Sequence, residues 1–167
     1  FNEFSGGTFV EKCCHYFDLI NLLADGQPKD VFASGGQAVN FLNFAHEGRK
    51  SDIDDHGFAI INYRNGIRAN FTLNMFANEF YEELVITGEK GRLVASEKAS
   101  ADKKRQTKAS IMVEVEGHQH YEGSKIGYPP SIEKSGHHGA TFFEHEALIS
   151  QLQQKEVDAA TPRQGLM

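Results

Sequence analysis

The chain has 167 residues, of which 40% are hydrophobic and 24% are charged, a composition typical of one soluble domain. Its formal net charge of −6 argues against a nucleic-acid partner, because phosphate binding needs clustered Lys and Arg, and the basic run 103–105 lies in a short polar stretch. No apolar run approaches the roughly 20 residues of a membrane-spanning helix. The only cysteines, Cys13 and Cys14, are adjacent and give no disulfide framework, so we expect a soluble, cytoplasmic protein.

The first predicted element is a helix over 8–24. It follows Gly6-Gly7, and Gly26 with Pro28 beyond it supplies the stop signal. At about 100° per residue, its two sides differ in polarity. The side expected to pack on a core holds Phe9, Cys13, Phe17, Ile20 and Ala24, and the opposite side holds Glu11, His15, Asp18 and Leu22. Because the apolar Leu22 shares the polar side, we expect that side not to be simply open to water.

A β-hairpin is predicted next, with strands at 58–63 and 67–75 joined by the turn Asn65-Gly66. The second strand alternates strictly between apolar and polar residues, which gives it one core face and one polar face. The polar face consists of Arg68, Asn70, Thr72 and Asn74. Further strands are expected at 83–87, 92–96 and 110–116, with turns at Gly88 and Gly91.

Two more helices are predicted, one over 141–154 that opens with a capping box of Thr141 and Glu144, and a shorter one near 38–45. A helix, a run of mostly antiparallel strands and a final helix indicate an α+β fold, in which helices pack on one face of an open sheet. The chain has no initiator Met, and 161–164 has the form of a helix start. We therefore interpret 1–167 as one domain, truncated at both ends.

The strongest candidate site is the polar side of the first helix. Spacings of four and three residues place Glu11, His15 and Asp18 on one face. There one carboxylate can orient the imidazole and another can hold a substrate hydroxyl, while the imidazole takes a proton from an alcohol. A helix surface with one His and two acids is also a common ion-paired surface, so the spacing alone leaves both interpretations open.

Other chemical patterns are weaker. His118 and His120 have the spacing of some metal sites, but no third ligand is fixed, so we predict no metal site. Cys13 is expected to pack rather than react, and the acidic run 52–55 is interpreted as a turn that enters a strand. No Gly-x-Gly-x-x-Gly motif occurs, so the sequence has no signature of a dinucleotide pyrophosphate site.

The run from Ser5-Gly6-Gly7 to Asp18 resembles the start of the C-terminal domain of the Gfo/Idh/MocA oxidoreductases, the family of glucose-fructose oxidoreductase and inositol dehydrogenase. The resemblance covers nearly the whole chain, through 65–69, 88–91, 136–139 and 161–165 in order. The chain departs from the family at two places: Glu11 stands where the family usually has Asp, and Cys13 where it usually has Gly.

The resemblance implies roles for several residues. His15 would be the acid/base histidine, Glu11 its orienting partner, Asp18 a ligand of a substrate hydroxyl, and His138 a substrate contact. The family's catalytic lysine lies in its first domain in a Glu-Lys-Pro motif, which Glu11-Lys12 is not. The implied cofactor is NAD or NADP, held mainly by a Rossmann domain outside this chain, and the implied substrate is a sugar, polyol or inositol-like molecule.

These observations predict the substrate-binding part of an NAD(P)-dependent dehydrogenase, inactive as an isolated fragment. An alternative is a module for self-association, because an open sheet with one polar face is suited to pairing face to face, and family members often form homo-oligomers in that way. A second alternative, also implied by the resemblance, is a glycosidase that uses bound NAD in a transient redox cycle.

Overall fold

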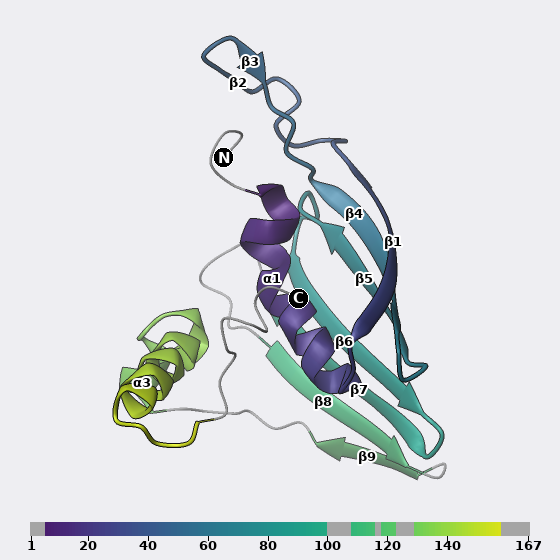
Figure 1. Ribbon diagram of the computed structural model, residues 1–167, viewed down its shortest axis with the longest axis vertical. Coiled ribbons are helices and arrows are strands. Elements are labelled where there is room, and N and C mark those ends of the chain that lie inside the picture. Colours follow the sequence, from purple (N-terminus) through teal and green to yellow (C-terminus); the bar gives the residue numbers. More distant parts are fainter. Residues whose placement is uncertain (1–5, 100–107, 116–117, 123–128, 158–167) are drawn as a thin grey trace. The chain divides into compact units, whose positions relative to one another are not determined.

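The computed structural model describes residues 6–99, 108–115, 118–122 and 129–157 (Figure 1). The described residues divide into two compact units, 6–76 and 77–157. The predicted α+β class with antiparallel strands is confirmed. In the described part, no helix is long and apolar enough to cross a bilayer.

The first unit consists of helix α1 (Gly7–Ala24) and a three-stranded antiparallel sheet. The strand order is β1 (Pro28–Gly36), β4 (His56–Tyr63), β5 (Arg68–Asn74). Between β1 and β4 the chain makes a turn and a short hairpin, β2 (Ala45–His46) with β3 (Arg49–Lys50), which extends beyond the end of the sheet in Figure 1. The predicted first helix is thus confirmed, with its start one residue earlier.

The predicted hairpin is β4 and β5. Gly66 has a φ of +91°, a conformation that a side chain disfavours, and its N–H donates to the carbonyl of Tyr63. The loop is closed by Tyr63, whose N–H donates to the Ile67 carbonyl at 2.9 Å. Along β5 the even-numbered residues are exposed and the odd-numbered ones half-buried, as the alternation predicts.

The core of this unit lies between α1 and the sheet. Ala24, Ile61 and Tyr63 are buried there. Phe17, Ile20 and Ala69 pack against them, and Cys13 is fully buried on the same side of the helix. The predicted core side of the helix is therefore confirmed.

The second unit contains a four-stranded antiparallel sheet in chain order, β6 (Phe80–Gly88), β7 (Gly91–Ala99), β8 (Lys108–Val115) and β9 (His118–Glu122). It continues with α2 (Pro130–Glu133), the short 3₁₀ helix η1 (His137–Gly139) and α3 (Ala140–Leu152). The three strands predicted in this region are confirmed. The described strands belong to three antiparallel sheets, β1-β4-β5, β2-β3 and β6-β7-β8-β9, where we expected one.

The helix predicted near 38–45 is wrong. The segment forms turns, followed by β2. The backbone N–H groups of Ala38, Val39 and Asn40 all donate to the carboxylate of Asp55, and Phe41 then takes a φ of +63°. The bonds to Asp55 hold the turn, and Phe41 ends it, because a left-handed residue cannot continue a right-handed helix.

The capping box predicted for the last helix is also wrong. Helix α3 begins at Ala140, so Thr141 lies inside its first turn. Its N-cap is Gly139, which has a φ of +103°, and no side chain caps the helix. Because two glycines with positive φ, Gly136 and Gly139, set the path of the chain before α3, the Thr-x-x-Glu spacing does not coincide with the helix start.

Candidate functional site on helix α1

The three predicted site residues of the first helix share one exposed face. Glu11, His15 and Asp18 follow one another at spacings of four and three in α1, and all three are exposed. No hydrogen bond or ion pair joins them among the described residues. In this unit the face is open, and neighbouring Leu22 is also exposed.

The rotation of α1 on the sheet is fixed from its other side. Near its start, the Thr8 hydroxyl donates to the Asp54 carbonyl at 2.7 Å. Near its end, the Tyr63 hydroxyl donates to the side-chain oxygen of Asn21 at 2.7 Å. Together with the apolar contacts of Phe17, these two bonds turn the polar side of the helix away from the sheet.

The ring of His15 contacts the first of several aromatic side chains that pack together between α1 and the sheet. Its ring lies 4.1 Å from the ring of Tyr16, centroid to centroid, with an interplanar angle of 44°. Tyr16 in turn lies 5.8 Å from Phe71, a residue of β5. Phe71 also meets Phe9 at 6.4 Å and Phe17 at 4.8 Å, so four aromatic rings join the helix to the sheet beneath His15.

The side chain of Cys13 packs between α1 and the sheet. Its side chain is fully buried, and burial, with a smaller contribution from Cys14 beside it, raises the pKa of the Cys13 thiol. A thiol with a raised pKa is a poor nucleophile. Cys13 therefore belongs to the helix–sheet packing.

The fourth predicted site residue lies in the other unit. His138 falls in η1, and its side chain lies outside the part that the structure describes. The substrate contact of His138 remains a prediction. The side chains of His118 and His120 in β9 are likewise outside the described part. Among the residues that are described, no group of three His, Cys, Asp or Glu could hold a metal ion.

A buried carboxylate at the entry of β4 was missed by the sequence interpretation. Asp55 is 0% exposed, and its oxygens accept hydrogen bonds from the N–H groups of Ala38, Val39 and Asn40 at 2.6 to 2.9 Å. Its Oδ1 also lies 2.9 Å from Nδ1 of His56. Burial by itself would raise the pKa of Asp55, but the hydrogen bonds with His56 and with the three backbone groups outweigh it and hold the pKa well below its usual range.

The glycine pair Gly35–Gly36 does not form a dinucleotide site. Gly35 and Gly36 end β1, and the turn that Asp55 holds follows them in place of a helix. A pyrophosphate site of the Rossmann type needs a strand, a tight turn and the N-terminus of a helix in succession. This part of the chain does not fit the pyrophosphate of NAD or NADP.

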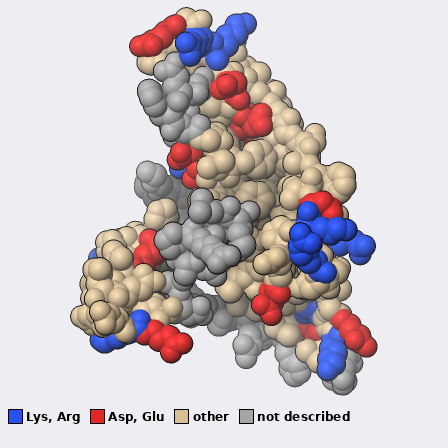
Figure 2. Space-filling model, viewed as in Figure 1, with Lys and Arg blue, Asp and Glu red and all other residues tan. Residues whose placement is uncertain are grey.

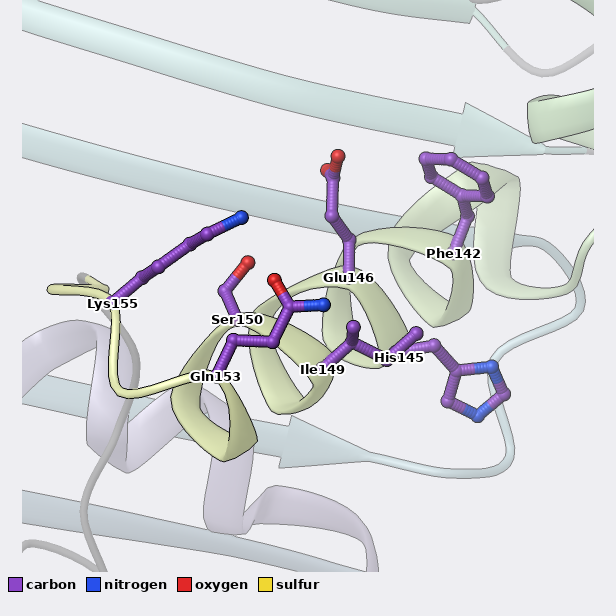
Figure 3. Close-up of a pocket in the computed structure, with 7 residues that line it drawn as sticks. All are labelled: Phe142, His145, Glu146, Ile149, Ser150, Gln153 and Lys155. Atoms are coloured by element: carbon purple, nitrogen blue, oxygen red, sulfur yellow. The ribbon is translucent and has the colours of Figure 1, made fainter.

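A hollow lies along one side of α3 and the turn that follows it (Figure 3). The backbone N–H of Lys155 donates to the Ser150 carbonyl at 3.0 Å, which folds the chain back toward the helix. None of the predicted site residues lines this hollow. Its lining consists of Phe142, His145, Glu146, Ile149, Ser150, Gln153 and Lys155.

Charged side chains do not gather into one basic patch on the face of the molecule drawn in Figure 2, where acidic and basic groups alternate among uncharged ones. The short hairpin shows the same mixture, with Glu47 beside Arg49 and Lys50.

Several solved structures have folds similar to this chain. The match with the WlbA dehydrogenase from Bordetella pertussis, in complex with NADH and UDP-GlcNAcA, covers 98% of this chain and 41% of that protein, with 20% sequence identity and a TM-score of 0.58. The match with the UDP-N-acetylglucosamine 3-dehydrogenase GnnA from Acidithiobacillus ferrooxidans covers 93% of this chain and 42% of that protein, with 18% identity and a TM-score of 0.60. The match with the aldose-aldose oxidoreductase from Caulobacter crescentus, complexed with glycerol, covers 96% of this chain and 42% of that protein, with 14% identity and a TM-score of 0.61.

At these identities the likeness concerns the fold, and the chain spans about two fifths of the length of these proteins. No curated protein matches the sequence significantly. A family model described as the C-terminal alpha/beta domain of an oxidoreductase family matches residues 1–167. The resemblance noted from the sequence is thereby confirmed, and the chain belongs to the Gfo/Idh/MocA oxidoreductase family, of which it is the C-terminal domain.

Proposed function

We propose that this chain is the substrate-side domain of an NAD(P)-dependent dehydrogenase that oxidises a CH–OH group of a sugar, polyol or inositol-like molecule. The observation that carries the proposal is the exposed face of α1, where Glu11, His15 and Asp18 stand together in a domain of the oxidoreductase family. The solved relatives are named as enzymes of nucleotide sugars and aldoses, which favours a sugar substrate.

In the proposed reaction the imidazole of His15 accepts the hydroxyl proton of the substrate. NAD or NADP, when bound, supplies the acceptor for the hydride that leaves the carbinol carbon. The Asp18 carboxylate accepts a hydrogen bond from a second substrate hydroxyl, and Glu11 orients the imidazole. His138 is proposed to contact the substrate from the second unit.

The nucleotide site is proposed to lie outside this chain, because the sequence lacks the Gly-x-Gly-x-x-Gly motif and a turn, not a helix, follows Gly35–Gly36. An isolated chain of this sequence would then bind NAD(P)H weakly and turn over no sugar. The face of α1 would form one wall of a cleft between two domains, where ligand sites are common.

Steady-state kinetics of a protein that joins this domain to its dinucleotide-binding domain test the proposal. His15→Ala is expected to lower kcat by roughly 10² to 10⁴, the usual contribution of a general base. Asp18→Ala is expected mainly to raise KM, and Glu11→Gln to lower kcat less than His15→Ala does. Lys12→Gln, a neighbouring exposed change, is the control. A kcat for His15→Ala within about threefold of the parent would refute the proposed role, since a lost general base costs far more.

A glycosidase that uses NAD in a transient redox cycle is the alternative within the same family. It would release a free sugar from a glycoside without accumulating reduced nicotinamide. Measuring both products for the same substrate separates the two: net reduced nicotinamide supports the dehydrogenase, and free sugar without it supports the glycosidase.

A second candidate function is self-association through the sheet of the first unit. The predicted polar residues of β5, Arg68, Asn70, Thr72 and Asn74, are all exposed. The register places Thr72 opposite Phe58 and Asn70 opposite Ile60, and Ile60 opposite Phe32 of β1. These three apolar side chains are 55%, 52% and 65% exposed. We propose that a second copy of the chain covers this face, because an exposed apolar patch of this kind marks an interaction site.

A further inference from the structure

His15 has one close ring contact, and it is with its neighbour in the sequence. The centroids of the His15 and Tyr16 rings are 4.1 Å apart, and the rings are tilted by 44°. Consecutive residues of a helix point about 100° apart and do not normally face each other. The contact arises because Tyr16 stands at the boundary of α1, half-buried, between the exposed face and the side that packs on the sheet.

The other side of Tyr16 is anchored in the sheet. Its ring lies 5.8 Å from the ring of Phe71, and the two planes differ by 31°. Phe71 is a half-buried residue of β5, opposite the buried Ala59 of β4 in the register. Phe17 and Phe9 pack against Phe71 from α1 at 4.8 Å and 6.4 Å. Phe71 is therefore held by its strand neighbour and by two more rings, and it offers Tyr16 a fixed surface.

No carboxylate holds the imidazole in the same way. Within the described residues, Glu11 and Asp18 form no hydrogen bond or ion pair with His15, and all three side chains are exposed. An exposed side chain samples several rotamers unless a neighbour restricts them. The aromatic contact with Tyr16 is the restriction that the structure provides.

We propose that Tyr16 is a positioning residue for His15, and that it transmits the position of Phe71 in the sheet to the imidazole on the helix surface. The inference rests on the proposed function of His15 as the general base. A base must meet the substrate hydroxyl at hydrogen-bond distance, and a displacement of about 1 Å can cost on the order of 10² in rate. Loss of the Tyr16 ring would leave the imidazole present but poorly placed.

The test compares three variants in the protein that carries both domains. Tyr16→Leu removes the ring, and Tyr16→Phe keeps it and removes only the hydroxyl. Ile20→Ala is the matched control, because Ile20 packs from the same helix on the buried residues Ala24, Ile61 and Tyr63 and is not one of the rings that hold Phe71. We expect Tyr16→Leu to lower kcat by roughly 10- to 100-fold with KM changed less than about threefold. Tyr16→Phe and Ile20→Ala should keep kcat within about threefold, although Ile20→Ala lowers the melting temperature.

A spectroscopic measurement accompanies the kinetics. The ring of Tyr16 shifts the NMR signals of the His15 ring protons, which are identified by their disappearance in His15→Ala. This shift should persist in Tyr16→Phe and vanish in Tyr16→Leu. If Tyr16→Leu does not fold, Tyr16→Met, which fills similar space without a flat ring, replaces it in both measurements.

The outcomes separate this inference from the function on which it rests. Retained activity in His15→Ala would overturn the proposed function, and the role of Tyr16 with it. A large loss in His15→Ala together with an unchanged kcat in Tyr16→Leu would overturn the role of Tyr16 alone. An equal fall of kcat in Ile20→Ala and Tyr16→Leu would also overturn it, because a general loss of helix packing would then explain both.

Discussion

Asp55 shows how a single buried charge can determine the path of a loop. Its carboxylate accepts three successive backbone N–H groups from the turn after β1 and bonds to the His56 ring. A carboxylate is tolerated in a fully buried position only when such bonds replace its hydration. Asp55 thus connects the end of β1 to the start of β4 and supports the base of the β2–β3 hairpin.

The lowered pKa of Asp55 makes a prediction about acid stability. Because the pKa is lower in the folded state than in the unfolded state, the unfolded chain binds more protons in acid, and stability falls as pH decreases. The contribution of Asp55 is complete above about pH 4 and is lost progressively below it. Asp55→Asn should lower the melting temperature at neutral pH and flatten its acid dependence.

Thermal unfolding followed by circular dichroism across this pH range measures both effects. Asp52→Asn is the control, because Asp52 is an exposed residue of the same acidic run. If Asp55→Asn and Asp52→Asn gave the same curve as the parent, the carboxylate of Asp55 would not be the support described.

The sequence could not reveal this role of Asp55. Its three backbone partners lie 15 to 17 residues away in the chain, and nothing in the acidic run distinguishes the buried carboxylate from its exposed neighbour. The sides of α1, by contrast, were predictable, because helical periodicity is local and Cys13 and Ala24 are buried as it indicates.

At the scale of elements, the loop between β4 and β5 joins the hairpin to the helix. The side-chain amide of Asn65 donates to the Ala24 carbonyl at 2.8 Å, at the end of α1. Its Oδ1 accepts the N–H of Ile67 at 3.2 Å. Asn65 therefore satisfies one of the carbonyls that a helix end leaves without a partner, while Gly66 provides the turn.

Gly66→Ala isolates the contribution of the turn. No atom lies within 4 Å of a Cβ added at Gly66, so the expected loss comes from its φ of +91° alone. A left-handed residue with a side chain costs about 1–2 kcal/mol, which lowers the melting temperature by roughly 2 to 8 °C. Gly88→Ala is the control: its surroundings are equally open and its backbone is not left-handed, so its effect should stay within about 0.5 kcal/mol. Equal melting temperatures for the two variants would contradict this explanation.

The hairpin was predictable because Asn65-Gly66 and the alternation of β5 both lie within a few residues of the structure that they specify. The helix near 38–45 was predicted wrongly because Phe41 takes a left-handed φ of +63°, which ends the helical turn that Asp55 holds, and a local apolar pattern does not reveal this. The division of the described strands into three sheets was not predictable either, since strand pairing depends on contacts that a local pattern does not contain.

At the scale of the whole molecule, the outward face of the first sheet combines the polar row of β5 with Phe32, Phe58 and Ile60. The sequence indicated the polar row, because it alternates within one strand. It could not show that apolar side chains lie beside that row, because this depends on the register between strands.

Phe58→Glu tests self-association through this face. A charge at the centre of an apolar interface is expected to cost at least about 2 kcal/mol, or roughly a 30-fold weaker association. Analytical ultracentrifugation of the protein and the variant measures this change. Leu22→Glu is the control, since Leu22 is an exposed apolar residue of α1 and not of the sheet. A strictly monomeric parent at high concentration would contradict the proposed assembly.

The proposed catalytic role of α1 is tested most directly by the rate of hydride transfer in a single turnover. With substrate and oxidised nicotinamide both saturating, the absorbance of the reduced nicotinamide reports the chemical step without binding or product release. We expect His15→Ala to slow this step by roughly 10² to 10⁴. The protein should remain folded, because His15 is exposed and lies away from the buried side of the helix. An unchanged rate of hydride transfer in His15→Ala would contradict the proposed role.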